Sequence, residues 1–251
     1  MRLRINQVGM SFVAPDGGTL DALGPVSATI DAGQFVALLG PSGCGKSTLV
    51  QIIAGLQIPT QGQAWLDDRP IKRPSRRIGV MFQDANLMPW RTVEQNVGLP
   101  LEIAGVSPVV RKRNVLSLLE PLGLADFAEA FPAELSGGMA QRVALGRVLI
   151  QQPDVLLLDE PFGALDALTR EKISLDLLTV WAQHRQTVLM VTHDVNEAVL
   201  LADRVLVMSR RPGRFVADIQ VELPRPRNVD LIYTPEFMQT ARAVRSAIDR
   251  S

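Results

Sequence analysis

The chain has 251 residues, of which 47% are apolar, so it is long enough to bury the core of one large α/β domain and is not a disordered polypeptide. Its 26 basic and 26 acidic residues leave no formal net charge, which argues against a dedicated nucleic-acid-binding protein. The single cysteine, Cys44, excludes an internal disulfide framework and fits a reducing compartment. No stretch approaches the ~20 apolar residues that cross a bilayer. We therefore expect a soluble chain without a secretory signal at its start.

Short β-segments are predicted in the first part of the chain. Residues 3–8 alternate apolar and polar side chains, as a half-buried strand does. Residues 26–30 and 35–39 are two further apolar segments, separated by the turn sequence Asp-Ala-Gly at 31–33. A short turn between two such segments predicts that they pair as antiparallel neighbours.

The helical period dominates from about residue 93 to 152, and we predict a mostly helical subdomain inserted there into an α/β core. Residues 155–158, Val-Leu-Leu-Leu, are a fully apolar run typical of a buried parallel strand. Helical and strand patterns then alternate to about residue 208. The predicted domains are residues 1–227 and a short helical tail over 228–251.

A glycine-rich loop follows the strand predicted at 35–39. Residues 40–47 read Gly-Pro-Ser-Gly-Cys-Gly-Lys-Ser and match the phosphate-loop pattern G-x-x-x-x-G-K-[ST]. Glycines let backbone N–H groups surround phosphates, Lys46 adds a charge near the β- and γ-phosphates, and the Ser47 hydroxyl is a Mg²⁺ ligand. The alternative is a glycine-rich turn, in which Cys44 is only a small residue that fits. The predicted nucleotide-binding residues of this segment are Gly40, Pro41, Ser42, Gly43, Cys44, Gly45, Lys46, Ser47 and Thr48.

Two carboxylates follow the apolar run at 155–158. We predict that Asp159 ligates Mg²⁺ and that Glu160 is the general base that activates water. Strands also end in solvated acids without any catalytic role. Small-molecule kinases and GTPases with a phosphate loop would fit the chain up to this point.

Residues 135–142, Leu-Ser-Gly-Gly-Met-Ala-Gln-Arg, distinguish these classes. Ser136 is a suitable N-cap, and the two glycines allow a close backbone approach to an anion at the start of a helix. This segment resembles the signature motif of ATP-binding cassette (ABC) proteins, and we refer to it as the signature segment. A P-loop kinase would lack it.

The resemblance covers nearly the whole chain and implies the fold of an ABC cassette of the P-loop NTPase class. This α/β fold has a RecA-like core with a mixed sheet, an antiparallel β-subdomain and an inserted helical subdomain. The resemblance also implies that Gln83 senses the metal, that His193 contacts the γ-phosphate, and that residues 163–166 contact a second subunit. Phe12 is the candidate for stacking on adenine. The implied site therefore comprises catalytic Glu160, His193 and Lys46, the Mg²⁺ ligands Ser47, Gln83 and Asp159, and the ATP-binding residues Phe12, Ser136, Gly137, Gly138 and Gln141 beside those of residues 40–48.

In this family, the signature segment of one subunit covers the ATP held by the phosphate loop of another. The resemblance implies a homodimer, or a pair with a second ABC subunit, that hydrolyses ATP and drives an integral membrane permease, with a solute-binding protein as an indirect partner and no nucleic acid. It places the chain at the cytoplasmic face of the bacterial inner membrane. Trp90, in a proline-containing loop, is predicted to dock on the permease, although local packing would explain it equally.

Several runs are similar to those of importers for nitrate, alkanesulfonates, taurine and thiamine precursors, among them Leu-Met-Pro-Trp at 87–90 and Arg-Pro-Gly-Arg at 211–214. The expected solute is a small anion of the nitrate, sulfonate or taurine type, and the alternative transport functions are import of thiamine precursors and export or lipid trafficking. A soluble ABC ATPase acting on DNA or the ribosome is a further rival. The arginines at 210, 211, 214, 225 and 227 are expected to form a solvated surface strip.

Overall fold

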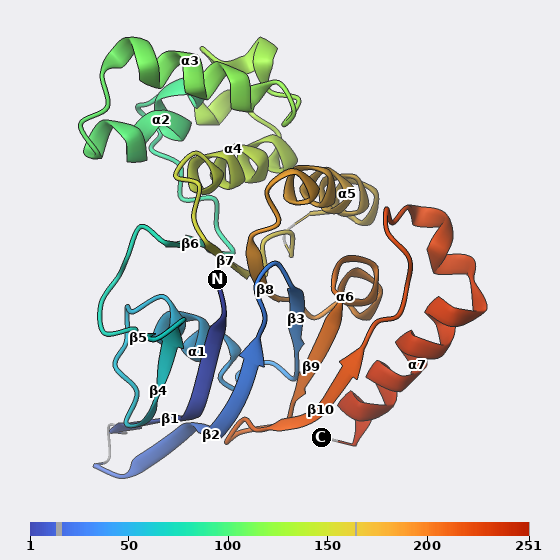
Figure 1. Ribbon diagram of the computed structural model, residues 1–251. Helices are drawn as coiled ribbons and strands as arrows, with labels where there is room; N and C mark the ends of the chain where they lie inside the picture. Colours follow the sequence, from blue (N-terminus) through green and yellow to red (C-terminus); the bar gives the residue numbers. More distant parts are fainter. Residues whose placement is uncertain (14–16, 164, 251) are drawn as a thin grey trace.

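The computed structural model describes residues 1–13, 17–163 and 165–250. Within these residues, a four-stranded antiparallel sheet has the order β2-β1-β4-β5, and a six-stranded sheet has the order β10-β9-β3-β8-β7-β6 (Figure 1). The strands are β1 (Leu3–Val13), β2 (Thr19–Ile30), β3 (Phe35–Leu39), β4 (Gln61–Leu66), β5 (Arg69–Pro70), β6 (Ile78–Met81), β7 (Val155–Asp159), β8 (Thr187–Val191), β9 (Arg204–Met208) and β10 (Phe215–Gln220). The α-helices are α1 (Lys46–Ile53), α2 (Val93–Ile103), α3 (Pro108–Leu119), α4 (Gly137–Leu149), α5 (Ala167–His184), α6 (Val195–Leu201) and α7 (Pro235–Asp249).

The central strand β3 pairs in parallel with β8 on one side and β9 on the other. The prediction that residues 26–30 and 35–39 pair with each other is therefore wrong, because β2 pairs with β1 in the other sheet. Every residue of β3 is buried. A strand that is apolar on both faces needs cover on both faces, and the centre of a parallel sheet provides it.

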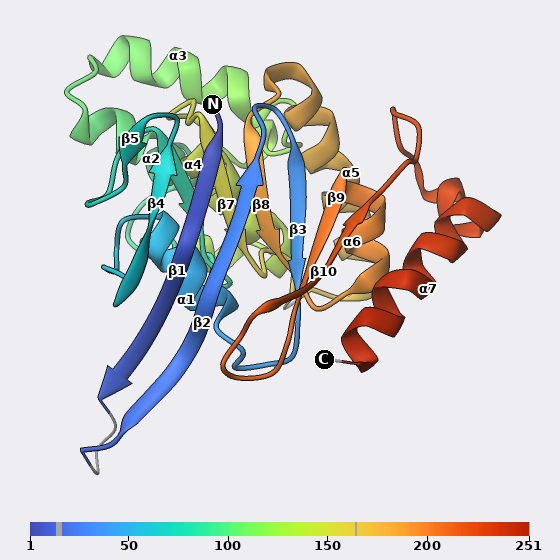
Figure 2. The same ribbon diagram turned by 60° about the horizontal axis from the view of Figure 1, so that its bottom comes forward.

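Helix α1 lies between the two sheets (Figure 2). Its residues Leu49 and Ile53 belong to one buried cluster with Leu3 of β1 and Leu189 of β8. Apolar residues lie on more than one side of this short helix, because it contacts a sheet on each side. Gly55, at φ +74°, follows its end. This packing fixes the start of α1, and with it the phosphate loop, against both sheets.

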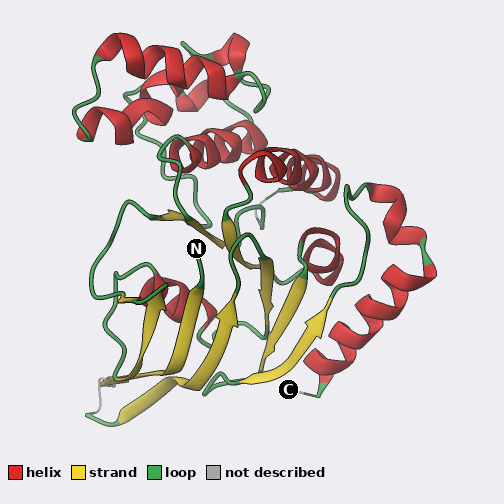
Figure 3. Cartoon of the chain, viewed as in Figure 1, coloured by secondary structure: helices red, strands yellow, loops and turns green. Residues whose placement is uncertain are grey.

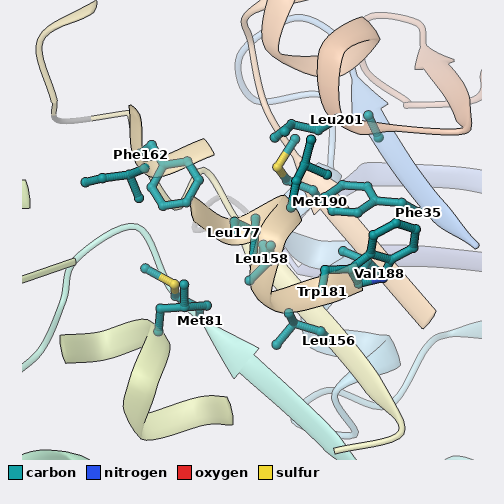
Figure 4. Packing of buried hydrophobic residues seen from close by; sticks show 14 of the residues in the cluster. Phe35, Met81, Leu156, Leu158, Phe162, Leu177, Trp181, Val188, Met190 and Leu201 are labelled. Carbon is teal, nitrogen blue, oxygen red and sulfur yellow. The ribbon is translucent and has the colours of Figure 1, made fainter. Parts of the chain in front are cut away.

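A second hydrophobic cluster covers the other face of the large sheet (Figure 4). The rings of Phe35 and Trp181 meet edge to face with centroids 5.6 Å apart. The indole N–H of Trp181 donates to the Gln186 carbonyl at 2.7 Å. Helix α7 packs here too, with Phe237 and Val244 buried. The tail predicted at 228–251 therefore contributes to the core, and the domain boundaries stay a prediction.

Residues 93–149 contain α2, α3 and α4 with short 3₁₀ turns at Ala125–Phe127 and Pro132–Glu134, which lie together above the large sheet (Figure 3). Thr92 begins α2 with a capping box shared with Gln95. Over the described ranges, none of the helices combines the length and the apolar character needed to span a bilayer.

Two of the arginines expected in a solvated strip are packed instead. The Arg225 guanidinium lies 4.4 Å from the centroid of the Trp181 ring. The side chain of Arg227 is 1% exposed and donates to the carbonyls of Val199, Leu200 and Ala202 at the end of α6. Burial lowers the pKa of Arg227 to about 10, so it is still protonated at neutral pH. These arginines stabilise a helix terminus.

Candidate active site

The polar residues predicted for catalysis follow neighbouring parallel strands. The loop at 40–47 follows β3, Gln83 follows β6, Asp159 ends β7, and His193 follows β8. Because β6, β7, β8 and β3 are neighbours and run in parallel, their carboxyl ends meet at one edge of the sheet. Ligand sites of open α/β sheets form at this edge.

The phosphate loop is closely packed against its surroundings. A Cβ on Gly45, which has φ +103°, would lie 2.7 Å from the Ala22 carbonyl oxygen, and a Cβ on Gly40 would lie 2.9 Å from Met208. Lys46 is only 6% exposed, and its Nζ donates to the carbonyls of Gly40 at 2.8 Å and Pro41 at 2.9 Å. The ammonium group is thus directed into the centre of its own loop.

Cys44 of the loop is buried at 1% exposure. Burial raises the pKa of its thiol, with the nearby Lys46 opposing this shift. A buried, protonated thiol fills space and is a poor nucleophile. The residue fits the loop as a small packing group.

Hydroxyl and carboxylate oxygens meet beside the loop. The Ser47 hydroxyl donates to Asp159 Oδ1 at 3.2 Å. Burial raises the pKa of Asp159, and the Ser47 hydrogen bond opposes the shift while the Glu160 charge adds to it. Glu160 Oε2 lies 3.4 Å from His193 Nδ1. The Ser47 hydroxyl and the two carboxylates are hard oxygen donors of the kind that Mg²⁺ prefers. A divalent cation would offset the charge repulsion between the adjacent carboxylates of Asp159 and Glu160.

A cavity of about 550 Å³ opens over the loop. It brings together predicted residues from several elements with three that were not predicted for the site, Leu20, Ala22 and Arg211. The residues that line it are Phe12, Leu20, Ala22, Ser42, Gly43, Gly45, Lys46, Ser47, Thr48, Gln83, Glu160 and Arg211.

Arg211 was expected in the solvated strip, yet it reaches the phosphate loop. Its Nε and Nη2 donate to the Gly43 carbonyl at 3.1 and 2.9 Å. The turn that carries it also touches the loop region, since a Cβ on Gly213 would lie 2.0 Å from the Cys44 carbonyl oxygen. Arg211 and Gly43 are separated by 168 positions in the sequence, so no local pattern reveals the contact.

The signature segment is not part of this cavity. Ser136 caps α4 and accepts from the Met139 N–H at 3.2 Å, as its residue type predicts. Ser136, Gly137 and Gly138 are absent from the described lining. A Cβ on Gly138 would lie 2.8 Å from Thr169 Cγ2, so the start of α4 packs closely on α5. The described residues of one chain thus keep the two predicted halves of the site apart.

Helix α4 nevertheless contacts the site through the segment after β6. Gln141 is buried, and its Nε2 donates to the Gln83 carbonyl at 2.8 Å. Arg147 donates to the carbonyls of Ala85 and Asn86 at 2.7 and 2.8 Å. Gln141 therefore holds the backbone of a cavity residue and does not line the cavity itself.

The segment predicted to contact a second subunit, residues 163–166, follows Glu160. Ala164 lies outside the described residues. Asp166 caps α5, with Oδ1 accepting from the Thr169 N–H at 3.0 Å. Trp90, the residue predicted to dock on a permease, is 71% exposed.

The phosphate loop follows β3, and the acidic pair lies at the end of β7, with β8 between these two strands. This arrangement defines a P-loop nucleoside triphosphatase. Residues 23–163 match the family described as ABC transporter. The chain belongs to this family and is an ATP-binding ATPase of the cassette type.

Known proteins agree with this assignment along most of the chain. The taurine import ATP-binding protein of Rhizobium johnstonii is 46% identical over 223 residues, which cover 89% of this chain and 85% of that protein. The aliphatic sulfonates import ATP-binding protein of Bacillus cereus is 42% identical over 228 residues, covering 91% and 89%. The solved dimer of the ATP-binding cassette MJ0796 in a post-hydrolysis state with ADP and Pi superimposes with a TM-score of 0.77 at 33% identity, covering 88% of this chain and 100% of that one.

Proposed function

We propose that the chain is the ATP-hydrolysing subunit of an importer for small anions of the nitrate, sulfonate or taurine type. The observation that carries the ATPase site is the meeting of the phosphate loop, Asp159, Glu160 and His193 at one edge of the sheet. The proposed class of solute is supported by the taurine and aliphatic sulfonate importers among the relatives. Import is favoured over export because those relatives carry out import.

The nucleotide would occupy the cavity over the loop. Backbone N–H groups of the loop residues other than Pro41 and the Lys46 ammonium would bind the phosphates, together with Thr48 at the start of α1. Phe12, which lines the same cavity, would stack on adenine. Ser47, Asp159 and Gln83 would hold Mg²⁺, which supplies charge neutralisation on the β- and γ-phosphates when bound.

Glu160 is the proposed general base. Its carboxylate would accept a proton from the water that attacks the γ-phosphorus, so that ATP and water yield ADP and phosphate. His193 Nδ1 lies 3.4 Å from Glu160 Oε2, where it would orient this carboxylate. The same ring is proposed to donate to the γ-phosphate. Lys46 would stabilise the charge that develops on the leaving group.

A second subunit is proposed to complete each site. In one chain the signature segment and the cavity are separate, so the exposed Ser136 and Gly137 are available to cover a nucleotide held by a partner cassette, while Gly138 is buried against α5. Gln141 would couple this segment to Gln83 through their 2.8 Å hydrogen bond. The pair would be two copies of this chain, or this chain with a second ABC subunit.

The exposed Trp90 and the loop that follows β6 are proposed to dock on an integral membrane permease. Docking would place the chain peripherally at the cytoplasmic face of a bacterial inner membrane. A solute-binding protein would deliver the anion to the permease, and recognition of the solute would lie in those partners.

Reconstitution with its cognate permease tests the proposal. ATP turnover in liposomes is measured against binding protein loaded with taurine, an alkanesulfonate, nitrate or a thiamine precursor. We expect stimulation by one of the small anions and uptake of that anion into the compartment opposite the binding protein. Stimulation by the thiamine precursor alone, or transport in the opposite direction, would refute the proposed solute class or direction.

A further inference from the structure

A polar cluster lies directly behind Glu160 and His193. We define it as Arg170 and Ser174 of α5 together with Thr192, Asp194 and Glu197 around the start of α6. Arg170, Thr192, Asp194 and Glu197 line one small enclosed space together with Glu160, Gly163 and His193. None of these five residues has a role in the proposed chemistry. The cluster nevertheless contacts the segment that follows Glu160 and the segment that carries His193.

Arg170 connects those two segments. Its Nη2 donates to the Leu165 carbonyl at 2.7 Å and its Nε to the Phe162 carbonyl at 3.2 Å, both in the segment after Glu160. Its Nη1 lies 3.4 Å from Asp194 Oδ2, in the residue after His193. A planar guanidinium presents several N–H donors in a fixed arrangement, so one side chain fixes both backbone segments relative to each other.

The segment that carries His193 is held on its other side by Glu197. This carboxyl is 8% exposed and accepts from the hydroxyls of Thr192 and of Ser174, the latter at 3.3 Å. The Thr192 oxygen in turn accepts from the Asp194 N–H at 3.1 Å. His193 is therefore held between two residues whose side chains are both hydrogen-bonded.

We propose that Arg170 is a positioning residue for ATP hydrolysis, which keeps the segments of Glu160 and His193 in register so that the two side chains stay in contact. The inference rests on the proposed roles of Glu160 and His193 and adds a residue that does not line the nucleotide cavity. Reacting groups displaced by about 1 Å lose on the order of 10²-fold in rate. Loss of the contacts made by Arg170 should therefore lower turnover without weakening ATP binding.

Arg170→Lys is the primary test. Lysine keeps the positive charge, but its single ammonium lacks the fixed fork that serves two carbonyls and a carboxylate together. In the permease-containing liposomes we expect kcat to fall by about 10- to 100-fold. We expect the KM for ATP and the affinity for MgATP to stay within roughly twofold, because the cavity residues are unchanged.

Arg204→Lys is the matched control. Arg204 is also mostly buried, at 14% exposure, and donates to Asp218 and to the Thr29 carbonyl. It lies at the start of β9, at the amino edge of the sheet, away from the nucleotide cavity. This variant should show wild-type kcat and KM. An equal loss of kcat in both variants would mean that any lost arginine contact lowers activity, and would overturn the inference.

Asp194→Asn covers the case in which Arg170→Lys fails to fold. Asparagine is also a good N-cap, so α6 keeps its cap, while the charge opposite Arg170 is removed. A kcat loss in the same direction, of about 3- to 10-fold, is expected, since one contact of three is weakened. Wild-type kcat in Asp194→Asn, or in a folded Arg170→Lys variant, refutes the positioning role.

Glu160→Gln distinguishes this inference from the proposed function. If that variant retains turnover, the assigned base is wrong whatever Arg170 does. If it is inactive while Arg170→Lys is fully active, the assigned base stands and only the positioning role fails.

Discussion

The phosphate loop and the signature segment of this chain are prepared for an anion in different ways. Lys46 is turned inward onto the carbonyls of Gly40 and Pro41, and Ser47 is hydrogen-bonded to Asp159, so both side chains have hydrogen-bond partners within the chain. The signature segment caps its own helix through Ser136, and none of its residues is among those described as lining the cavity.

The difference indicates that the phosphate loop depends on its own chain, whereas the signature segment depends on a second subunit. The loop has its lysine, its hydroxyl and its carboxylates in one chain, so nucleotide binding should depend mainly on that chain. In the proposed pair, the signature segment would act on a nucleotide held by the other subunit. Substitutions in the two regions should therefore affect binding and turnover separately.

The largest expected effect is that of Glu160→Gln. Removing a positioned general base costs about 10²- to 10⁴-fold in kcat. Because the amide is nearly isosteric and no phosphate contact is lost, MgATP should still bind. The closed pair of subunits should then accumulate, and size-exclusion chromatography with MgATP would detect it. A variant that turns over at the wild-type rate, or that stays monomeric with ATP bound, would contradict the assignment.

Lys46→Ala and Ser136→Arg sharpen the comparison directly. Loss of the lysine should weaken ATP binding by about 10- to 100-fold, since hydrogen bonds to charged groups contribute about 1.5–3 kcal/mol. Ser136→Arg should leave binding by the loop intact and block closure by its bulk. Mixing the two inactive variants should restore about one intact site in each mixed pair. A mixture no more active than either variant alone would argue that the sites are not shared.

Much of this arrangement follows from local sequence patterns. The apolar run at β7 followed by Asp159 and Glu160 predicts a buried strand with acids at its end, and the phosphate loop predicts a helix start, since both depend on neighbours in the chain. The pairing of β2 with β3 was predicted incorrectly because a short turn is a local signal, while the burial of β3 on both faces is decided by distant strands.

The arginines show the same limit at the level of single side chains. Residues 210–227 are rich in arginine and proline, and a solvated strip is the simplest interpretation of such a run. Arg227 is instead buried on the end of α6, and Arg211 lies on the phosphate loop. Which arginine finds carbonyl partners depends on where the turn after β9 packs, and no periodicity encodes that.

Arg211→Ala should have a moderate effect on the loop half of the comparison. The Gly43 carbonyl would lose two donors, and the cavity would lose a positive charge. We expect the dissociation constant for MgATP to rise by about 2- to 10-fold, in line with a net loss of about 0.5–1.5 kcal/mol. Arg210→Ala, at an exposed neighbouring position that does not line the cavity, is the control and should bind normally. Equal affinities for all three proteins would exclude a contribution from Arg211.

Glu197→Gln should produce the smallest effect, on stability and not on binding. Burial raises the pKa of Glu197, with the hydrogen bonds from Thr192 and Ser174 and the charge of Arg170 opposing the shift and the charge of Asp194 adding to it. A carboxyl whose pKa is higher in the folded state is stabilising in its protonated form, and that stability is lost as the pH rises from the unfolded value of about 4.3 through the folded value. Glutamine does not ionise, so the melting temperature of Glu197→Gln minus that of the wild type should increase over this range and then level off. Thermal unfolding between acid and neutral pH measures the difference. If the difference in melting temperature stays the same at every pH, Glu197 has the same pKa in the folded and unfolded chains. That result would contradict the claim that burial raises this pKa.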